Sequence, residues 1–246
     1  MVAAITAGGR VDGALAQAMG TSVKALAAVG GSTLLARAIL AARGTGAARL
    51  VVVGGPEVRA ACQSVVDDVL PAVSDGRENL RRALVAAGAD PLLLLSSDLP
   101  FVDGEALQAF LAGTGDAEAA MPLAAEADYS RAYPGAASHS VDLAGERVAN
   151  GSVFYFAPNV APRVLAAAQR LFAARKSLLK LAALLGPVLL ARFALRKLRV
   201  EDVERRAQTA LGVRARAVRG ASPSLCYDID TLEDYRYAVE HAQRRS

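Results

Sequence analysis

The feature that most constrains the fold is the run of four leucines at positions 92–95, which contains no polar residue. A short strand with no polar face is typical of the centre of a parallel sheet, where both faces are buried under helices. The run ends in the polar sequence Ser-Ser-Asp, followed by Leu99 and Pro100. We therefore expect a buried central strand at residues 92–95, with a loop at its carboxyl end.

Other apolar runs alternate along the chain with segments of helical periodicity. Strands are predicted at residues 2–6, 50–53, 117–122 and 153–156, and helices at residues 33–40, 57–63, 77–87, 104–111 and 231–243. Residues 124–150 predict a loop with short strands, whereas residues 160–211 are helical with breaks at Gly186 and Gly212. This alternation predicts an α/β fold with a mostly parallel central sheet flanked by helices. We expect one domain over residues 1–246.

Composition excludes several classes of protein. With 53% hydrophobic and 21% charged residues, the chain does not resemble a disordered protein. Cys62 and Cys226 lie far apart and lack zinc-ligand spacing, which argues against a zinc site and a disulfide framework. The net charge is only +4 and there is no tryptophan. We interpret the basic residues at 192–219 as a solvated helix face and expect no nucleic-acid partner.

Residues 178–198 are the candidate for a membrane segment. Charged residues and the pair Gly186-Pro187 interrupt this segment. Its uncharged part is about half of the roughly 20 residues that a membrane span requires. We expect buried helices there, with a helix on a lipid surface as the alternative. Residues 2–6 are too short for the core of a secretory signal. These features favour a cytoplasmic protein without membrane contact.

The loop after the first predicted strand contains Gly8 and Gly9, and Lys24 follows later. Glycines in such a loop let backbone N–H groups approach a phosphate, and a lysine adds a mobile positive charge. The glycine spacing fits neither common phosphate-binding motif, so a tight turn with an exposed lysine is the alternative. Because lysine is scarce in this arginine-rich chain, Lys24 is a candidate binding residue.

Asp98 follows the most apolar strand directly. Ligands of open α/β sheets bind at the carboxyl ends of the strands, and a carboxylate there can hold a hard divalent cation. The alternative role is a cap for the next helix, but that helix is predicted to begin near Asp103. We therefore expect Asp98 to bind a metal or a substrate.

Asp228 and Asp230 lie two residues apart in a segment that is predicted to be extended. Alternation places both side chains on the same side of such a segment. Asp230 could supply a second carboxylate to the cation held by Asp98. Alternatively, Asp230 or Thr231 caps the helix that follows. The residues alone leave both interpretations open.

The order of these motifs resembles that of the MobA-like nucleotidyltransferases. The resemblance extends over residues 2–237 and is firmest at residues 7–9, 24–26, 30–31, 97–100 and 228–234. It implies a Rossmann-like fold. It also implies transfer of an NMP from an NTP to a phosphorylated acceptor, with release of pyrophosphate and with Mg²⁺ as cofactor.

The resemblance assigns roles to individual residues. Lys24 and Asp98 are the catalytic residues, and Asp98 and Asp230 hold the Mg²⁺. The residues assigned to the nucleotide are Ala7, Gly8, Gly9, Arg10, Lys24 and Asn79. An acceptor phosphate is already a nucleophile, so the reaction requires positioning and electrostatic stabilisation more than a general base.

The chain also departs from the family pattern. The usual loop reads Gly-Gly-x-Gly-x-Arg-Met-Gly, whereas Arg10 here follows Gly9 directly and is the candidate for the loop arginine. Residues 175–211 form a predicted helical insert beyond the minimal fold, as in a longer branch of the family. Arg175 and Lys176 at its start are candidates for binding the acceptor. A solvated first helical turn is the alternative for this pair.

Other functions remain open at this stage. One is an inactive nucleotide-binding or regulatory protein of the same fold. Another is a glycosyltransferase of GT-A type, which the absence of a second Asp beside Asp98 disfavours. An oxidoreductase is disfavoured by the glycine spacing. We expect His139 and His241 to be surface residues. The base, the acceptor (molybdopterin, a sugar phosphate or a lipid phosphate) and the oligomeric state are not determined by the sequence.

Overall fold

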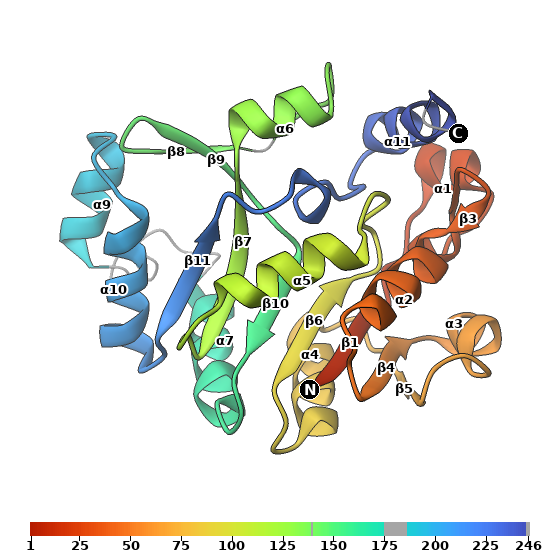
Figure 1. Cartoon of the computed structure of the whole chain (residues 1–246), viewed down its shortest axis with the longest axis horizontal. Helices are drawn as coiled ribbons and strands as arrows, with labels where there is room; N and C mark the ends of the chain where they lie inside the picture. Colours follow the sequence, from red (N-terminus) through yellow and green to blue (C-terminus); the bar gives the residue numbers. More distant parts are fainter. Residues whose placement is uncertain (139, 175–185, 245–246) are drawn as a thin grey trace.

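The computed structural model of this chain describes residues 1–138, 140–174 and 186–244. Its main feature is a nine-stranded sheet (Figure 1). The strands are β1 (Val2–Ala7), β4 (Arg49–Gly54), β5 (Asp68–Pro71), β6 (Leu92–Ser96), β7 (Ala119–Ala125), β8 (Val141–Leu143), β9 (Glu146–Asn150), β10 (Val153–Phe156) and β11 (Ala215–Arg219). They lie in the order β5-β4-β1-β6-β10-β7-β9-β8, and β11 pairs with β7. The strands β5, β4, β1 and β6 are parallel to one another, whereas β10 is antiparallel to both β6 and β7.

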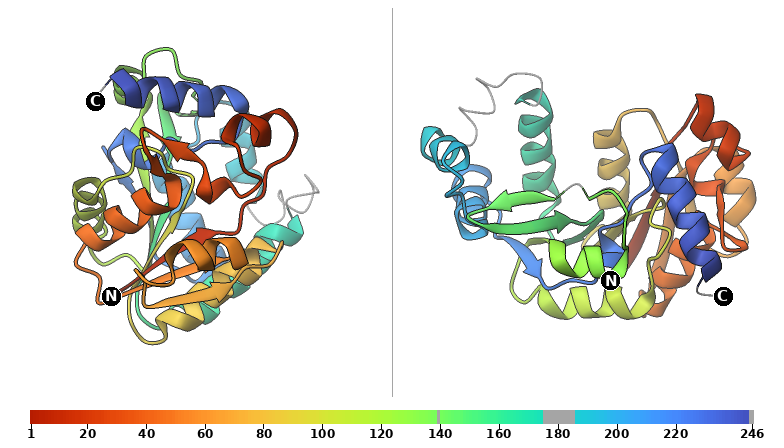
Figure 2. Two further views of the ribbon diagram at one scale, coloured as in Figure 1. Left: turned by 90° about the vertical axis from the view of Figure 1, so that its right-hand side faces the viewer. Right: turned by 90° about the horizontal axis from the view of Figure 1, so that it is seen from above.

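Helices cover both faces of this sheet. They are α1 (Gly13–Met19), α2 (Leu34–Gly44), α3 (Pro56–Cys62), α4 (Gly76–Ala87), α5 (Gly104–Gly113), α6 (Glu126–Ala132), α7 (Ala161–Ala174), α9 (Pro187–Ala194), α10 (Val200–Leu211) and α11 (Leu232–Arg244). Helices α2 and α5 pack on one face and α4 and α7 on the other. Seen edge-on, the sheet lies between these two layers (Figure 2). The predicted α/β architecture is therefore confirmed.

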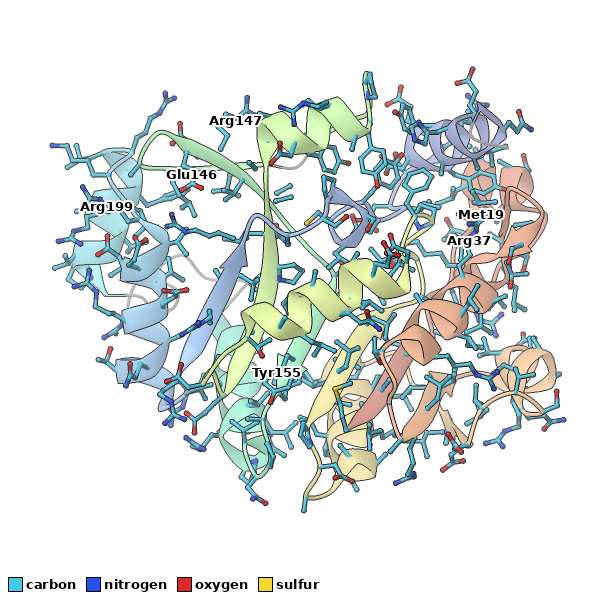
Figure 3. All side chains as sticks on the ribbon, viewed as in Figure 1. Met19, Arg37, Glu146, Arg147, Tyr155 and Arg199 are labelled. Carbon is cyan, nitrogen blue, oxygen red and sulfur yellow. The ribbon has the colours of Figure 1, made fainter. Side chains whose placement is uncertain are left out.

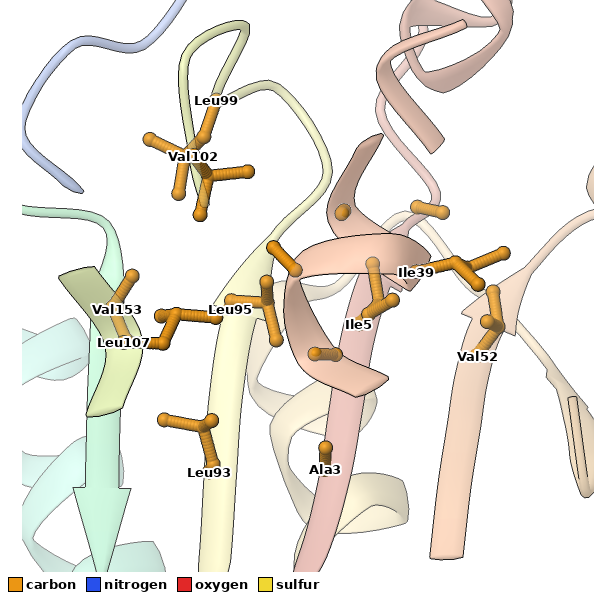
Figure 4. Close-up of a cluster of buried hydrophobic side chains, with 14 of the residues drawn as sticks. Ala3, Ile5, Ile39, Val52, Leu93, Leu95, Leu99, Val102, Leu107 and Val153 are labelled. Atoms are coloured by element: carbon orange, nitrogen blue, oxygen red, sulfur yellow. The ribbon is translucent and has the colours of Figure 1, made fainter. Parts of the chain in front are cut away.

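The strand β1 shows why the central strands contain almost no polar residues. Ala3 and Ile5 face the core under α2 and α5, whereas Val2 and Ala4 face the core under α4 and α7. Leu95 on β6 packs in the first of these cores with Ile5 (Figure 4). Because successive side chains of a strand point to opposite faces, a strand covered on both sides must be apolar throughout.

A third apolar cluster lies at the carboxyl end of the sheet, where α1, α6 and α11 meet. Phe101 stacks on Tyr133 at a ring-centroid distance of 4.9 Å and meets the edge of Tyr227 at 5.0 Å. The ring of His241 lies 5.1 Å from Phe101, so this residue is partly buried against the cluster rather than fully exposed. Met19 closes the cluster from α1 (Figure 3). His139 lies outside the described residues.

The middle of the chain is more regular than its sequence suggests. The predicted short strands are present, because β8 and β9 form an antiparallel hairpin, but residues 126–132 form α6 where a loop was expected. Tyr129 explains the helix, because this side chain is buried in the third cluster and fixes one face of α6. A helix of seven residues is too short to show a clear apolar period in the sequence.

The C-terminal basic segment is paired with carboxylates in the structure. Arg192 and Arg205 both contact the buried Asp202, and Arg219 contacts Glu146 and Glu201. These charges are therefore offset locally, at the end of the molecule where Glu146 is labelled in Figure 3. Helices α9 and α10 occupy part of the expected insert at residues 175–211, whose residues 175–185 are not described. No helix in the described part of the chain is both long and apolar enough to cross a membrane.

The central core predicts the stability of one pair of leucine variants. Leu107 on α5 is 0% exposed, whereas Leu40 on α2 is 74% exposed. We expect Leu107→Ala to lower the free energy of unfolding by about 2–5 kcal/mol, because it leaves a cavity in the core. Leu40→Ala should change it by roughly 0.5 kcal/mol or less. Urea denaturation of both variants checks this, and equal losses would contradict the placement of α5.

Candidate functional site

A cavity of about 350 Å³ opens at the carboxyl ends of β1 and β6. Five of the residues chosen from the sequence line it, namely Gly8, Gly9, Lys24, Asn79 and Asp98. Its volume lies in the range of small-molecule sites, and its position is where open α/β sheets bind ligands. The cavity is therefore the candidate functional site.

The two glycines bring the first loop close to its neighbours. A Cβ atom on Gly8 would lie 2.8 Å from the Cβ of Ala72, so only glycine fits there without a shift. Gly9 runs beside Lys24, whose backbone N–H donates to the Gly9 carbonyl at 3.0 Å. The aliphatic stem of Lys24 then crosses Gly9, because a Cβ there would lie 3.7 Å from its carbons. The loop thus directs Lys24 toward the cavity.

The ammonium group of Lys24 contacts both Asp98 and Asp230, which lie far apart in the sequence. Its Nζ donates to Asp98 Oδ2 at 2.7 Å and to Asp230 Oδ1 at 3.0 Å. The side chains of Lys24 and Asp98 are 13% and 16% exposed, whereas that of Asp230 is 63% exposed. Burial lowers the pKa of Lys24, but the two carboxylates outweigh this and hold it above its ordinary value. The amine is therefore charged at neutral pH.

Backbone contacts explain how Asp230 reaches this position. The N–H of Ile229 donates to the Asp98 carbonyl at 3.2 Å, which fixes the 228–230 segment beside the end of β6. The cap of α11 is supplied by Thr231, whose Oγ1 accepts from the N–H of Asp234 at 3.2 Å. The side chain of Asp234 in turn accepts from the N–H of Thr231. The sequence left two roles open for Asp230, a second carboxylate for a cation and a helix cap. In the structure Thr231 caps the helix, and the Asp230 carboxylate faces Lys24.

Asp228 also belongs to this cluster, although it was not among the residues chosen from the sequence. Its carboxylate accepts a hydrogen bond from Ser152 Oγ at 2.9 Å. Burial raises the pKa of Asp228, and the charge of Asp98 raises it further. Ser152 reaches Asp228 because Gly151 passes very close to the Leu225 carbonyl. The Asp-x-Asp alternation was the signal for Asp228, whereas nothing in the sequence indicated Ser152.

The oxygen atoms of Asp98 and Asp230 fit a hard divalent cation. Asp98 Oδ1 is buried and accepts no hydrogen bond from any residue that the structure describes. Within residues 1–138, 140–174 and 186–244, no group of three or more His, Cys, Asp or Glu side chains could hold a metal. Mg²⁺ in proteins is often held by only one or two carboxylates, together with water and substrate phosphates. The donor set present is of that kind.

The resemblance also assigned Ala7, Arg10 and Asn79 to the nucleotide, and each of them has a different environment in the structure. Ala7 is buried in the core below the cavity. Arg10 is half-exposed and pairs with Glu57 at 2.8 Å, and it is not part of the described cavity lining. The amide of Asn79 is bound to the backbone of Val73, donating to its carbonyl at 2.8 Å and accepting from its N–H at 2.9 Å.

Arg175 and Lys176 lie outside the described residues. Phe154 and Phe156 on β10 line the cavity and stack on one another, with ring centroids 6.4 Å apart. Their spacing of two along a strand predicts a shared face, but not that this face borders the cavity.

Comparison with known proteins identifies the family. A sequence model of the MobA-like NTP transferase domain matches residues 3–203. The chain belongs to this family. A hypothetical transferase from Thermus thermophilus is 27% identical and has a TM-score of 0.84, over 95% of this chain and 98% of that chain. No curated protein matches the chain.

More distant structures share the fold. A CMP:2-keto-3-deoxy-manno-octonic acid synthetase solved with CTP is 15% identical, with a TM-score of 0.60 over 100% of this chain and 99% of that chain. Rv0371C from Mycobacterium tuberculosis H37Rv, solved with manganese, is 20% identical, with a TM-score of 0.53 over 97% of both chains. The MobA-like domain therefore has the Rossmann-like fold of nucleotidyltransferases, as the resemblance implied.

The close approach at Gly151 predicts a stability difference between two glycine variants. A Cβ on Gly151 would meet the Leu225 carbonyl oxygen and the ring of Pro122, whereas a Cβ on Gly76 would meet nothing within 4 Å. We expect Gly151→Ala to lower the free energy of unfolding by about 1–3 kcal/mol or more, as overpacking does. Gly76→Ala should leave it nearly unchanged. Thermal unfolding of both variants in EDTA decides this, and a stable Gly151→Ala protein would contradict the close approach.

The raised pKa of Asp228 predicts a pH dependence of stability. At a pH between the ordinary pKa of 3.8 and the raised pKa, the folded protein keeps a proton on Asp228 that the unfolded chain has released. Stability therefore falls as the pH rises through the window between 3.8 and the raised value, and it stays lower above that window. Asn does not titrate and can still accept from Ser152.

We expect Asp228→Asn to be more stable than the wild type at pH 7 in EDTA, with the difference shrinking toward pH 4. Urea denaturation between pH 4 and pH 8 measures the difference. The control is Asp90→Asn, which removes a carboxylate from an exposed position instead of from this cluster. A loss of stability on Asp228→Asn that grows with pH would contradict the predicted sign.

Proposed function

We propose that this MobA-like domain transfers an NMP from an NTP to a phosphorylated small-molecule acceptor and releases pyrophosphate, with Mg²⁺ as cofactor. The observation that carries the proposal is the meeting of Lys24, Asp98 and Asp230 beside a cavity bordered by glycine backbone. A polyanion and a divalent cation require this combination: a mobile positive charge, two carboxylates and a close approach of the main chain.

The glycine side of the cavity suits the nucleotide. Gly8 and Gly9 expose main chain that has no side chain in the way, and Lys24 adds a positive charge beside them. Asn79 holds the neighbouring loop through Val73, and we propose that it shapes the nucleoside pocket in this way. The CTP bound in the octonic acid synthetase of similar fold supports a nucleotide as the ligand of such a cavity.

We propose that Asp98 and Asp230 hold the Mg²⁺. When bound, the ion supplies charge neutralisation to the phosphate oxygens and orients them. The buried, unpartnered Oδ1 of Asp98 supports this role, because a buried carboxylate oxygen without a partner is costly. The manganese complex of Rv0371C, which has a similar fold, supports a divalent cation.

The residues present match the demands of phosphate chemistry. The acceptor phosphate needs no strong base to attack the α-phosphate, and the described lining of the cavity contains no histidine or cysteine. The main barrier is the repulsion between anions, which Lys24 reduces by charge and the glycine backbone by hydrogen bonding. Arg175 and Lys176 are proposed to bind the acceptor, and Arg10 would have to leave Glu57 to reach a phosphate. A cytoplasmic location is part of this proposal.

The proposal is tested by a screen for pyrophosphate release. Each of the four NTPs is combined with Mg²⁺ and a panel of phosphorylated acceptors, including sugar phosphates, molybdopterin and lipid phosphates. Asp98→Asn should lower turnover by about 100-fold or more, since the loss of one group that stabilises transition-state charge costs roughly 100- to 1,000-fold elsewhere. Asp90→Asn, at an exposed position, is the matched control and should retain full activity.

Two outcomes would contradict the proposal. Full activity of Asp98→Asn would exclude its metal role. Binding of an NTP by the wild type without pyrophosphate release from any acceptor would instead favour a nucleotide-binding protein that has lost catalysis. Circular dichroism of each variant confirms that the fold is unchanged.

A further inference from the structure

Lys24 occupies the position that a cation would need. Among the residues that the structure describes, only its ammonium forms an ion pair with Asp98 or Asp230. It contacts Oδ2 of Asp98 and Oδ1 of Asp230 at the same time, so it bridges the two carboxylates. A divalent cation bound by the same two side chains would have to occupy the space between them.

The ammonium and a small cation cannot share these oxygens. Mg²⁺ binds oxygen at about 2.0–2.1 Å, closer than the 2.7 and 3.0 Å of the Lys24 contacts. A cation that bridges Oδ2 and Oδ1 would therefore lie next to Nζ, where the two positive charges repel at short range. One of them has to leave the carboxylates when the other is bound.

Lys24 has a route away from the carboxylates. Its backbone is fixed, because its N–H donates to Gly9 and its carbonyl accepts from Ala27 at 3.1 Å. The side chain, however, has four rotatable bonds, crosses Gly9 and borders the cavity. The ammonium can therefore turn toward phosphates in the cavity without a change in the backbone.

Asp98 has a carboxylate oxygen that no described residue uses. Its Oδ2 is bound to Lys24, but its Oδ1 accepts no hydrogen bond from the described residues. Because Oδ1 is buried, a cation would reach this carboxylate only once Lys24 has turned away, with Asp230 as its second contact. The exposed Asp230 is accessible for that second contact.

We propose that Lys24 holds the place of the divalent cation when no nucleotide is bound, and that nucleotide phosphates draw it away so that the cation can bind Asp98 and Asp230. This inference rests on the proposed function, because it takes the two carboxylates as the cation site. Nucleotide and cation then strengthen each other's binding, and by thermodynamic linkage the effect is equal in both directions. The cation alone binds the wild-type protein weakly.

The test measures Mn²⁺ binding in the absence of nucleotide by electron paramagnetic resonance. Lys24→Met removes the competing charge and keeps an aliphatic stem across Gly9. We expect it to bind Mn²⁺ at least about tenfold more tightly than the wild type, which corresponds to about 1.4 kcal/mol. The matched control is Arg10→Met, which removes a positive charge from the loop beside Lys24 without touching either carboxylate. Arg10→Met should change the affinity for Mn²⁺ by less than about a third of the change that Lys24→Met produces.

The outcomes separate this inference from the proposed function. Mn²⁺ binding by Lys24→Met that is equal to or weaker than that of the wild type overturns the inference, and so does equal tightening by Arg10→Met, which would show a general effect of charge. Adding Asp98→Asn to Lys24→Met should abolish the gained affinity. If the double variant still binds Mn²⁺ tightly, the cation site itself is wrong and the proposed function loses its metal centre. Thermal unfolding in EDTA verifies folding, and Lys24→Gln replaces Lys24→Met if the latter does not fold.

Discussion

The hydrogen bond from the Ile229 N–H to the Asp98 carbonyl is the contact on which the site depends. It brings a C-terminal segment to the end of β6, whereas Lys24, which follows α1, reaches the same point alongside the first loop. Three segments far apart in sequence therefore meet at one edge of the sheet. The parallel arrangement of β1 and β6 makes this possible, because their carboxyl ends lie side by side.

The carboxylates of Asp98, Asp228 and Asp230 lie close together and repel one another, so the surrounding structure has to keep them in place. Asp228 is half-buried near Asp98, and its raised pKa reflects an unfavourable environment for a second anion. The segment stays in place because Thr231 and Asp234 cap α11 and because Tyr227 is locked among aromatic rings. Such local conflict, stabilised by rigid neighbours, is typical of sites that bind charged ligands rather than of parts that only support the fold.

Much of the fold could be predicted because the core strands carry their own signal. Residues 92–95 indicated a strand buried on both faces, and the structure confirms one there. The sequence did not predict α6, which forms because Tyr129 is buried by distant residues. The same limit applies to the site: the motifs indicated Lys24 and Asp98, but the partners of Arg10 and Asn79 depend on contacts that only the folded chain creates.

The departure of the first loop from the family pattern bears on how the site balances charge. Arg10 is held by Glu57, and Lys24 is the one cation among the described residues that line the cavity. A single ammonium therefore faces two demands, the carboxylates on one side and the nucleotide phosphates on the other. It can meet both only in turn, which requires another positive charge on the carboxylates whenever the phosphates are bound. Under the proposed function, the divalent cation supplies that charge, and the coupling between the two ligands needs no movement of the sheet.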